Sequence, residues 1–139
     1  MIATILDRYP TPLCAQLLGL EILDADVPRG WVRIGFDAKM EFCNASGTIQ
    51  GGLLTAMLDD TMGPAVLIMT NAELYPTTID MSVSFLASAR PGRLFGEATV
   101  LQLGKSIGFI EASLTDAHDV KIARATSSVR LRPMRMARS

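Results

Sequence analysis

The feature that most constrains the fold of this chain is the stretch at residues 44–69, NASGTIQGGLLTAMLDDTMGPAVLIM. It opens with small and polar residues, passes through Gly51-Gly52, and continues as an apolar segment whose large side chains recur every three or four residues. That period is typical of a helix. Most of the remaining positions are small and apolar, so we expect a helix that is covered on nearly all of its sides.

Two adjacent carboxylates, Asp59 and Asp60, interrupt this apolar segment. Aspartate is unfavourable in the middle of a helix and is rarely buried without a partner. Their position therefore indicates a functional role. Gly63-Pro64 follows, and because proline removes a helix hydrogen bond and clashes with the preceding turn, we expect the helix to kink or to end there.

The chain before this segment is predicted to form a short helix and a hairpin. Residues 11–18 predict the helix, with Gly19 just past its end. Residues 20–27 and 31–36 predict the two strands of the hairpin, which turns across Pro28-Arg29-Gly30.

The chain after residue 76 changes to a period of two, which predicts strands joined by short turns at 77–87, 93–103, 106–116 and 121–131. Turns this short, with no helix between the strands, favour an antiparallel meander. We expect residues 1–10 to be a weakly ordered leader and residues 132–139 to be a frayed basic tail. The element order predicts a single α+β domain over residues 1–139, with one buried helix against one antiparallel sheet.

Composition narrows the class of protein. The 139 residues, 49% of them hydrophobic, fit one domain with some apolar surface in a subunit interface. The net charge of −1 gives no case for a nucleic-acid partner. Cys14 and Cys43 lack metal-ligand spacing and form no disulfide framework. No apolar run approaches the roughly 20 residues of a membrane span, and Asp7 and Arg8 stand where a signal peptide would be apolar. We therefore expect a cytoplasmic protein with no membrane partner.

Three motifs carry a resemblance to a known family. The first is Gly51-Gly52 followed, after six residues, by Asp59. The second is TIDM at 78–81 with ARPG at 89–92, and the third is GKS at 104–106. In this order and spacing they resemble the small acyl-CoA thioesterases of the phenylacetate-pathway and 4-hydroxybenzoyl-CoA type. The resemblance covers almost the whole chain and implies the α+β hotdog fold, in which a curved antiparallel sheet wraps a central helix.

The resemblance also implies a hydrolase that cleaves an acyl-CoA to a free acid and coenzyme A, with no cofactor and no metal. The Gly52 backbone amide would polarise the thioester carbonyl, since amides at a helix start are unpaired and lie at the positive end of the helix dipole. Asp59 would be the nucleophile or the general base. Asn44 would help to hold the carbonyl or the attacking water, and Thr78 would orient water or the carboxylate.

The two carboxylates are expected to differ in environment. We expect Asp59 to be partly buried in an apolar pocket with a raised pKa, which makes a carboxylate a better base near neutral pH. Asp60 lies about 100° further around the helix, and we expect it to be a solvent or interface partner. In this family the aspartate of one subunit faces the Gly-Gly helix start of another. The resemblance therefore implies at least a homodimer, and we expect a homotetramer.

The substrate pocket is expected to be apolar, which suits medium-chain or aryl acyl groups without choosing between them. Its predicted lining is Leu54, Leu58, Met62, Met81 and Phe85. Coenzyme A carries phosphates, so basic residues are expected at the pocket mouth. The predicted substrate-binding set is completed by Lys105 as the first candidate, Arg90 and Arg124 behind it, and Gln50, Gly51 and Ser106. The basic tail, Arg130, Arg132, Arg135 and Arg138, is a further candidate for the nucleotide.

Each of these assignments has a simpler structural alternative. Gly51-Gly52 can make a tight loop, Asn44 can be a turn residue and Thr78 can be a strand residue. Family members usually carry histidine before the two glycines, whereas this chain carries Gln50, which cannot titrate. The rival hypothesis is therefore a non-catalytic acyl-CoA-binding protein, a sensor or a carrier. With His118 as the only histidine, a Ser-His-Asp triad, a multi-histidine metal site and histidine-dependent hydratases are all disfavoured.

Overall fold

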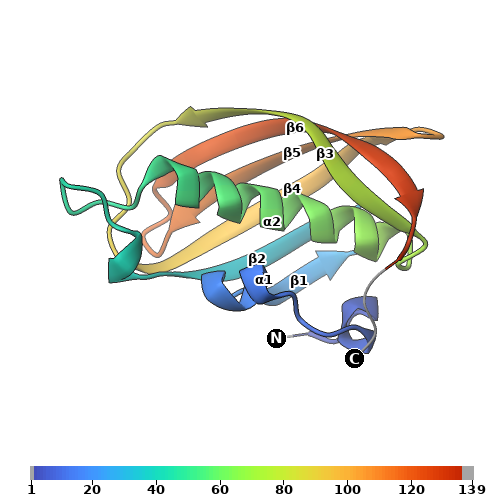
Figure 1. Ribbon diagram of the computed structural model, residues 1–139, viewed down its shortest axis with the longest axis horizontal. Coiled ribbons are helices and arrows are strands. Elements are labelled where there is room, and N and C mark those ends of the chain that lie inside the picture. Colours follow the sequence, from blue (N-terminus) through green and yellow to red (C-terminus); the bar gives the residue numbers. More distant parts are fainter. Residues whose placement is uncertain (1, 136–139) are drawn as a thin grey trace.

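A curved antiparallel sheet wraps around one long helix in the computed structural model, which describes residues 2–135 (Figure 1). The sheet has six strands in the order β1-β2-β4-β5-β6-β3. The strands are β1 Glu21–Asp26, β2 Trp31–Ala38, β3 Leu74–Phe85, β4 Gly92–Leu103, β5 Ile107–Asp116 and β6 Lys121–Pro133. The helices are α1 Leu13–Leu18 and α2 Gly51–Met69, with short 3-10 turns η1 Ile5–Arg8 and η2 Met40–Phe42. The α+β hotdog arrangement expected from the sequence is confirmed.

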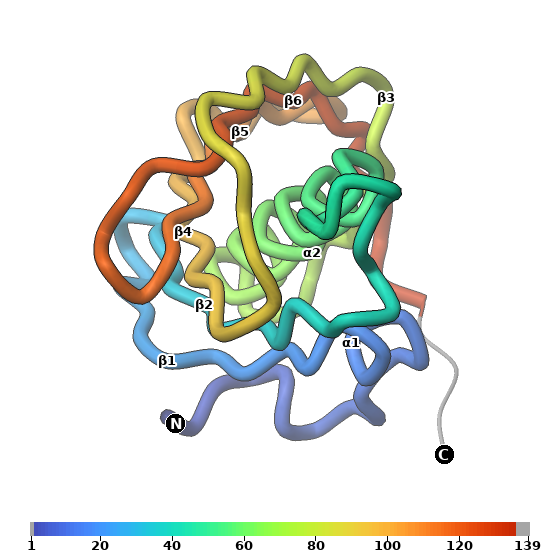
Figure 2. The backbone as a smooth tube through the Cα atoms, turned by 90° about the vertical axis from the view of Figure 1, so that its left-hand side faces the viewer, coloured from blue at the N-terminus to red at the C-terminus, as the bar shows by residue number. Residues whose placement is uncertain are grey.

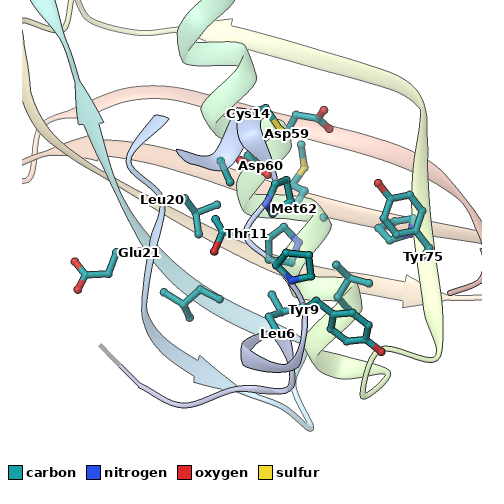
Figure 3. Close-up of a pocket in the computed structure, with 18 of the residues that line it drawn as sticks. Leu6, Tyr9, Thr11, Cys14, Leu20, Glu21, Asp59, Asp60, Met62 and Tyr75 are labelled. Carbon is teal, nitrogen blue, oxygen red and sulfur yellow. The ribbon is translucent and has the colours of Figure 1, made fainter. Parts of the chain in front are cut away.

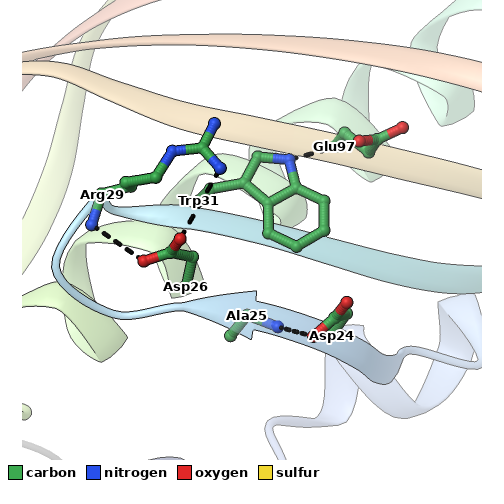
Figure 4. Close-up of polar contacts among 6 residues, drawn as sticks. All are labelled: Asp24, Ala25, Asp26, Arg29, Trp31 and Glu97. Carbon is green, nitrogen blue, oxygen red and sulfur yellow. Dashed lines mark hydrogen bonds and ion pairs between the residues drawn. The ribbon is translucent and has the colours of Figure 1, made fainter.

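The predicted hairpin is present as β1 and β2 (Figure 4). Its turn uses Gly30 at φ 63°, a left-handed conformation that glycine adopts without steric cost. Asp26 fixes the turn by accepting a hydrogen bond from the Arg29 amide at 3.3 Å. The Trp31 indole then donates to Glu97 of β4 at 3.2 Å, which ties the hairpin to the next strand of the sheet.

The predicted four-strand meander is correct only for β4, β5 and β6. β3 pairs with β6, so residues 86–91 do not form a hairpin turn but cross from one part of the sheet to another (Figure 2). Six extended residues reach about 20 Å, which exceeds the roughly 14 Å of three strand spacings. The length of this link therefore fits a crossover as well as a turn. The link is held beside the start of α2, where the Ile49 amide donates to the carbonyl of the buried Ala89 at 2.8 Å.

The helix α2 continues through Gly63-Pro64, so of the two expected outcomes, a kink or an end, the end does not occur. Pro64 is buried in the helix, and the packing of its neighbours Ala65 and Val66 in the core offsets the one lost backbone hydrogen bond. The expectation that no apolar run approaches the length of a membrane span is also wrong, because the 19 residues of α2 meet that criterion by length and composition. The helix is apolar because it is buried against the sheet as the core helix of the domain.

The N-terminal segment is more ordered than expected. Thr4 and Asp7 form a reciprocal capping box around η1, and α1 ends at Gly19 in the left-handed conformation, at φ 66°. Both elements lie on the side of α2 that the sheet leaves open (Figure 2). The start of the predicted tail is also ordered, since Pro133 pairs with Leu74 of β3.

One glycine sets how closely α2 approaches the sheet. The side chain of Thr61 is fully buried, and its hydroxyl donates to the Met57 carbonyl one turn earlier at 2.7 Å. This hydroxyl lies directly over Gly96 of β4, where a Cβ atom would overlap it and would come within 3.2 Å of the Phe36 ring. Gly96 therefore provides the space in which the helix backbone and the strand come together.

We expect the substitution Gly96→Ala to lower the free energy of unfolding by about 1–3 kcal/mol, because the added methyl group forces the helix and the sheet apart. Urea denaturation followed by circular dichroism measures this difference. Gly108→Ala is the matched control in the neighbouring strand, since its Cβ would meet Leu103 and Val129 at an ordinary 3.4 Å. An equal loss in both variants would contradict the assigned role of Gly96.

Candidate active site

The middle of α2 carries Asp59, which the structure connects to β3. The Thr78 hydroxyl donates a hydrogen bond to Asp59 Oδ1 at 2.8 Å, so the two residues singled out from the sequence lie together. Thr78 sits where the β3 register shifts against β6, between Thr78 and Asp80. In the single chain the Asp59 side chain is exposed, and the expectation that it is partly buried is wrong for one isolated copy.

The more buried of the two carboxylates is Asp60, which was expected to be a solvent or interface partner. The side chain is half-buried, and Oδ2 is inaccessible to solvent and has no hydrogen-bond partner among residues 2–135. Burial raises the Asp60 pKa from 3.8 to about 6, and the neighbouring charge of Asp59 adds to the rise. Figure 3 shows the cause: Asp60 lies beside the N-terminal segment and α1, whereas Asp59 lies on another side of the helix.

The start of α2 presents unpaired backbone donors. The amides of Leu53 and Leu54 bond to the Gln50 carbonyl, whereas the described chain contains no acceptor for the amides of Gly51 and Gly52. A Cβ added at Gly52 would meet nothing within 4 Å, so a ligand has free access to this position. One added at Gly51 would lie 3.2 Å from the ring of Phe85, which flanks the helix start. The Gln50 side chain is exposed and makes no capping bond.

Asn44 organises the loop that precedes α2. Its side-chain oxygen accepts hydrogen bonds from the amides of Ser46 at 2.9 Å and Thr48 at 3.2 Å. It also accepts from the Thr48 hydroxyl at 3.3 Å. These local contacts agree with the alternative in which Asn44 is an ordinary turn residue.

A pocket of about 570 Å³ lies between the N-terminal segment and α2 (Figure 3). Asp59, Asp60 and Thr78 are part of its wall. Of the five apolar residues predicted to line a substrate pocket, only Met62 lines this one; Leu54 and Leu58 are buried in the core, and Met81 and Phe85 lie further along β3. The opposite wall, which the sequence reasoning missed, consists of Leu6, Tyr9, Pro10, Thr11, Cys14 and Leu20. Thr4 and Asp7, spaced as a capping box, were the available signal that residues 1–10 are ordered.

A second pocket, of about 620 Å³, is basic. Ser106, Arg130, Arg132 and Arg135 line it together with Tyr75, Thr77, Leu131 and Pro133. Tyr75 also lines the first pocket, so the two adjoin. Among the other predicted phosphate ligands, Lys105 is exposed next to Ser106, whereas Arg90 and Arg124 are exposed outside both pockets. Arg138 lies outside the described residues.

Comparison with known proteins identifies the family. The sequence model of the thioesterase superfamily matches residues 46–123, which is more than half of the chain. Human acyl-coenzyme A thioesterase 13 is 34% identical over 102 residues, which cover 73% of this chain and 71% of that protein.

Two solved structures share the fold over most of the chain. A phenylacetic acid degradation-related protein from Ralstonia eutropha JMP134 has a TM-score of 0.85 and 28% identity, covering 91% of this chain and 95% of that one. A protein from Streptococcus mutans UA159, solved bound to acetyl-CoA, has a TM-score of 0.73 and 18% identity, covering 84% and 91%. The chain belongs to the thioesterase superfamily and is a thioester hydrolase.

Proposed function

We propose that this protein hydrolyses an acyl-CoA thioester, with Asp59 as the nucleophile or general base and the Gly52 amide as the donor that polarises the carbonyl. The observation that carries the proposal is the hydrogen bond from Thr78 to Asp59, which holds one carboxylate oxygen and leaves the other free to react. The free amide at Gly52, in open space at the positive end of the helix, supplies the complementary group. Gln50 beside it can donate a hydrogen bond but cannot transfer a proton by titrating.

These two groups cannot act on the same carbonyl within one chain. Gly52 and Asp59 are seven residues apart, so they lie on nearly the same face of α2 but about 10 Å apart along its axis. A thioester carbonyl that contacts both needs them within roughly 6–7 Å of each other, since each contact is about 3 Å long. We therefore infer that Asp59 of one subunit works with Gly52 of a second subunit.

The exposed edge of the sheet supports this assembly. β3 is an edge strand of 12 residues, and an unpaired edge of this length is a template for pairing with another strand. Its side chains Ile79 and Phe85 are 57% and 53% exposed. A homodimer that joins two β3 edges would cover them and would bring the two α2 helices together. On β4 and β5, exposed Leu101 and Phe109 offer an apolar surface through which two dimers would form the expected homotetramer.

The reaction follows one of two routes from this arrangement. In the first, Asp59 attacks the thioester carbon, coenzyme A leaves as the thiol after taking up a proton, and water hydrolyses the resulting anhydride. In the second, Asp59 takes a proton from a water molecule that attacks the same carbon directly, the C–S bond breaks, and coenzyme A leaves as the thiol with that proton. Both routes place negative charge on the carbonyl oxygen, which is the charge that the Gly52 amide stabilises.

Coenzyme A is the proposed carrier of the acyl group because a basic pocket adjoins the site. Arginine and hydroxyl groups bind phosphate by charge-assisted hydrogen bonds, and Ser106, Arg130, Arg132 and Arg135 line this pocket. The name of the human relative and the acetyl-CoA bound to the Streptococcus mutans protein agree with this proposal. Cys14 and Cys43 are free thiols, which fits the proposed cytoplasmic location.

We expect Asp59→Asn to reduce kcat by roughly 10³-fold or more without unfolding the protein, because the amide cannot act as a nucleophile or a base. Release of thiol from a panel of short-chain, long-chain and aryl acyl-CoAs measures this loss, and circular dichroism verifies folding. If the wild type binds these acyl-CoAs saturably but hydrolyses none, the protein is instead an acyl-CoA-binding hotdog protein.

The double substitution Arg130→Gln/Arg132→Gln is expected to raise KM for the best acyl-CoA about tenfold and to leave kcat nearly unchanged, because it removes binding to phosphate away from the reacting atoms. Steady-state kinetics with the matching S-acyl-N-acetylcysteamine, which lacks the nucleotide, should show no such rise. Lys121→Gln, an exposed cation at the start of the same strand, is the control. A KM that rises equally for both substrates would refute phosphate binding at this pocket.

A further inference from the structure

Two pockets of opposite charge meet at one residue, Tyr75. Four carboxylates line the pocket of about 570 Å³ beside α2, and no lysine, arginine or histidine of the described chain lines it. Three arginines line the pocket of about 620 Å³, which has no carboxylate among its described residues. Of all the described residues, only Tyr75 lines both pockets. A ligand that occupies both is therefore expected to pass Tyr75.

The charges fix the direction in which an acyl-CoA lies across the two pockets. Its phosphates are anions, which carboxylates repel and arginines bind. Its thioester has to reach Asp59, which belongs to the acidic pocket. The uncharged chain that joins the sulfur to the first phosphate, the pantetheine arm, therefore has to span the distance from Asp59 to the arginines.

The length of this arm agrees with the spacing of residues along β3. The arm contains about 13 bonds from sulfur to phosphorus, which is the length of roughly four extended residues or about 14 Å. Thr78, which donates to Asp59, lies three residues from Tyr75 and thus about 10 Å along the strand. Tyr75 is paired with Arg132 of β6, and Arg130 lies two residues before it on that strand. An extended arm that follows β3 from Asp59 passes Tyr75 and brings its phosphate to these arginines.

Tyr75 offers a contact surface along this route. It is the second residue of β3, and its side chain is 42% exposed. In Figure 3 it stands on β3, across the pocket from Leu20 and Glu21. A tyrosine ring presents an apolar face and a hydroxyl at its end. These groups suit an arm that carries two methyl groups and two amides.

We propose that Tyr75 is a substrate-binding residue whose ring packs against the pantetheine arm of the acyl-CoA, between Asp59 and the arginine pocket. This inference rests on the proposed acyl-CoA thioesterase function and adds the residue that joins its two pockets. The register of β3 shifts between Thr78 and Asp80, so the first part of the strand is separate from the edge over residues 80–85. The proposed dimer can pair along that edge while the arm occupies the first part.

The test places one acyl group, the best of the panel, on three thiols of different length. Coenzyme A carries the arm and the phosphates, whereas pantetheine carries the arm alone. N-acetylcysteamine ends just after the first amide, roughly 6 Å from the sulfur, and so stops short of Tyr75. Steady-state kinetics with the three thioesters therefore separate a contact at Tyr75 from binding of phosphate.

We expect Tyr75→Ala to raise KM about tenfold for the acyl-CoA and for the acyl-pantetheine, with kcat nearly unchanged, because the arm lies away from the reacting atoms. KM for the acyl-N-acetylcysteamine should stay that of the wild type, which also verifies that the fold and the reactive groups are intact. Tyr75→Phe keeps the ring and should hold KM within about threefold of the wild type. The matched comparison is Arg130→Gln/Arg132→Gln, which should raise KM for the acyl-CoA alone.

Three results would overturn the inference: a Tyr75→Ala variant with wild-type KM for the acyl-pantetheine, a KM that rises equally for all three thioesters, or a Tyr75→Phe variant that loses as much as Tyr75→Ala. Any of these, in a protein that turns over, leaves the proposed catalysis standing. If the wild type hydrolyses no thioester, the proposed catalysis fails instead. Calorimetric Kd values for thioether analogues of octanoyl-CoA and octanoyl-pantetheine then decide the role of Tyr75, and equal values in wild type and Tyr75→Ala reject it.

Discussion

The rest of the structure depends on one constraint, which is that α2 has no polar face. Its large apolar side chains pack against the concave side of the sheet. Its remaining positions are mostly small and apolar, so their exposure to water is unfavourable. The sheet covers one side and the N-terminal segment covers part of another. The side that carries Gly52 and Asp59 stays uncovered in the single chain. The uncovered side of a core helix is therefore the place where both a partner subunit and a substrate are expected.

The edge of the sheet, like the helix α2, has a side that the single chain leaves uncovered. β3 has β6 on one side and an unpaired edge on the other, and most of its side chains are exposed. Thr78 lies on this strand and donates a hydrogen bond to Asp59, so the edge that would pair with a second copy also holds the proposed catalytic carboxylate in position. In the proposed homodimer, pairing of the two β3 edges and completion of the site would therefore be one event.

Much of this architecture could be predicted from the sequence, and the failures have physical causes. Periods of 3.6 and 2 report which face of an element is buried, so α2 and all six strands were found within a few residues. Period does not report which strand lies beside which. A six-residue link can turn or cross, and the crossing from β3 to β4 depends on contacts such as that of Ile49 with Ala89, which are distant in sequence. The helix does not end at Pro64, as one of the two expectations had it, because tertiary packing outweighs one missing hydrogen bond.

The parts of the candidate site that depend on spacing along one helix were predictable from the sequence. The parts that depend on packing of distant segments were not. The seven-residue separation of Gly52 and Asp59 fixes their common face of the helix. Whether each carboxylate is covered depends instead on which neighbouring segment packs over it, and residues 1–10 gave little indication that they would do so. The same uncertainty affected the pocket wall, since Leu54 and Leu58 share the helix with Met62 but point into the core.

Asp59 and Asp60 show that environment, not residue type, sets the properties of each carboxylate in this site. Both are aspartates in the same turn of one helix, yet Asp59 is exposed and accepts a hydrogen bond from a hydroxyl, whereas Asp60 is half-buried and its Oδ2 atom has no partner among the described residues. A carboxylate that must react needs access and orientation, which Thr78 and the open side of α2 supply to Asp59. The N-terminal wall covers Asp60 instead, and this burial raises the pKa of Asp60 to about 6. Because adjacent helix residues point about 100° apart, one carboxylate of the pair lies on the open side of α2 and the other lies against the N-terminal wall.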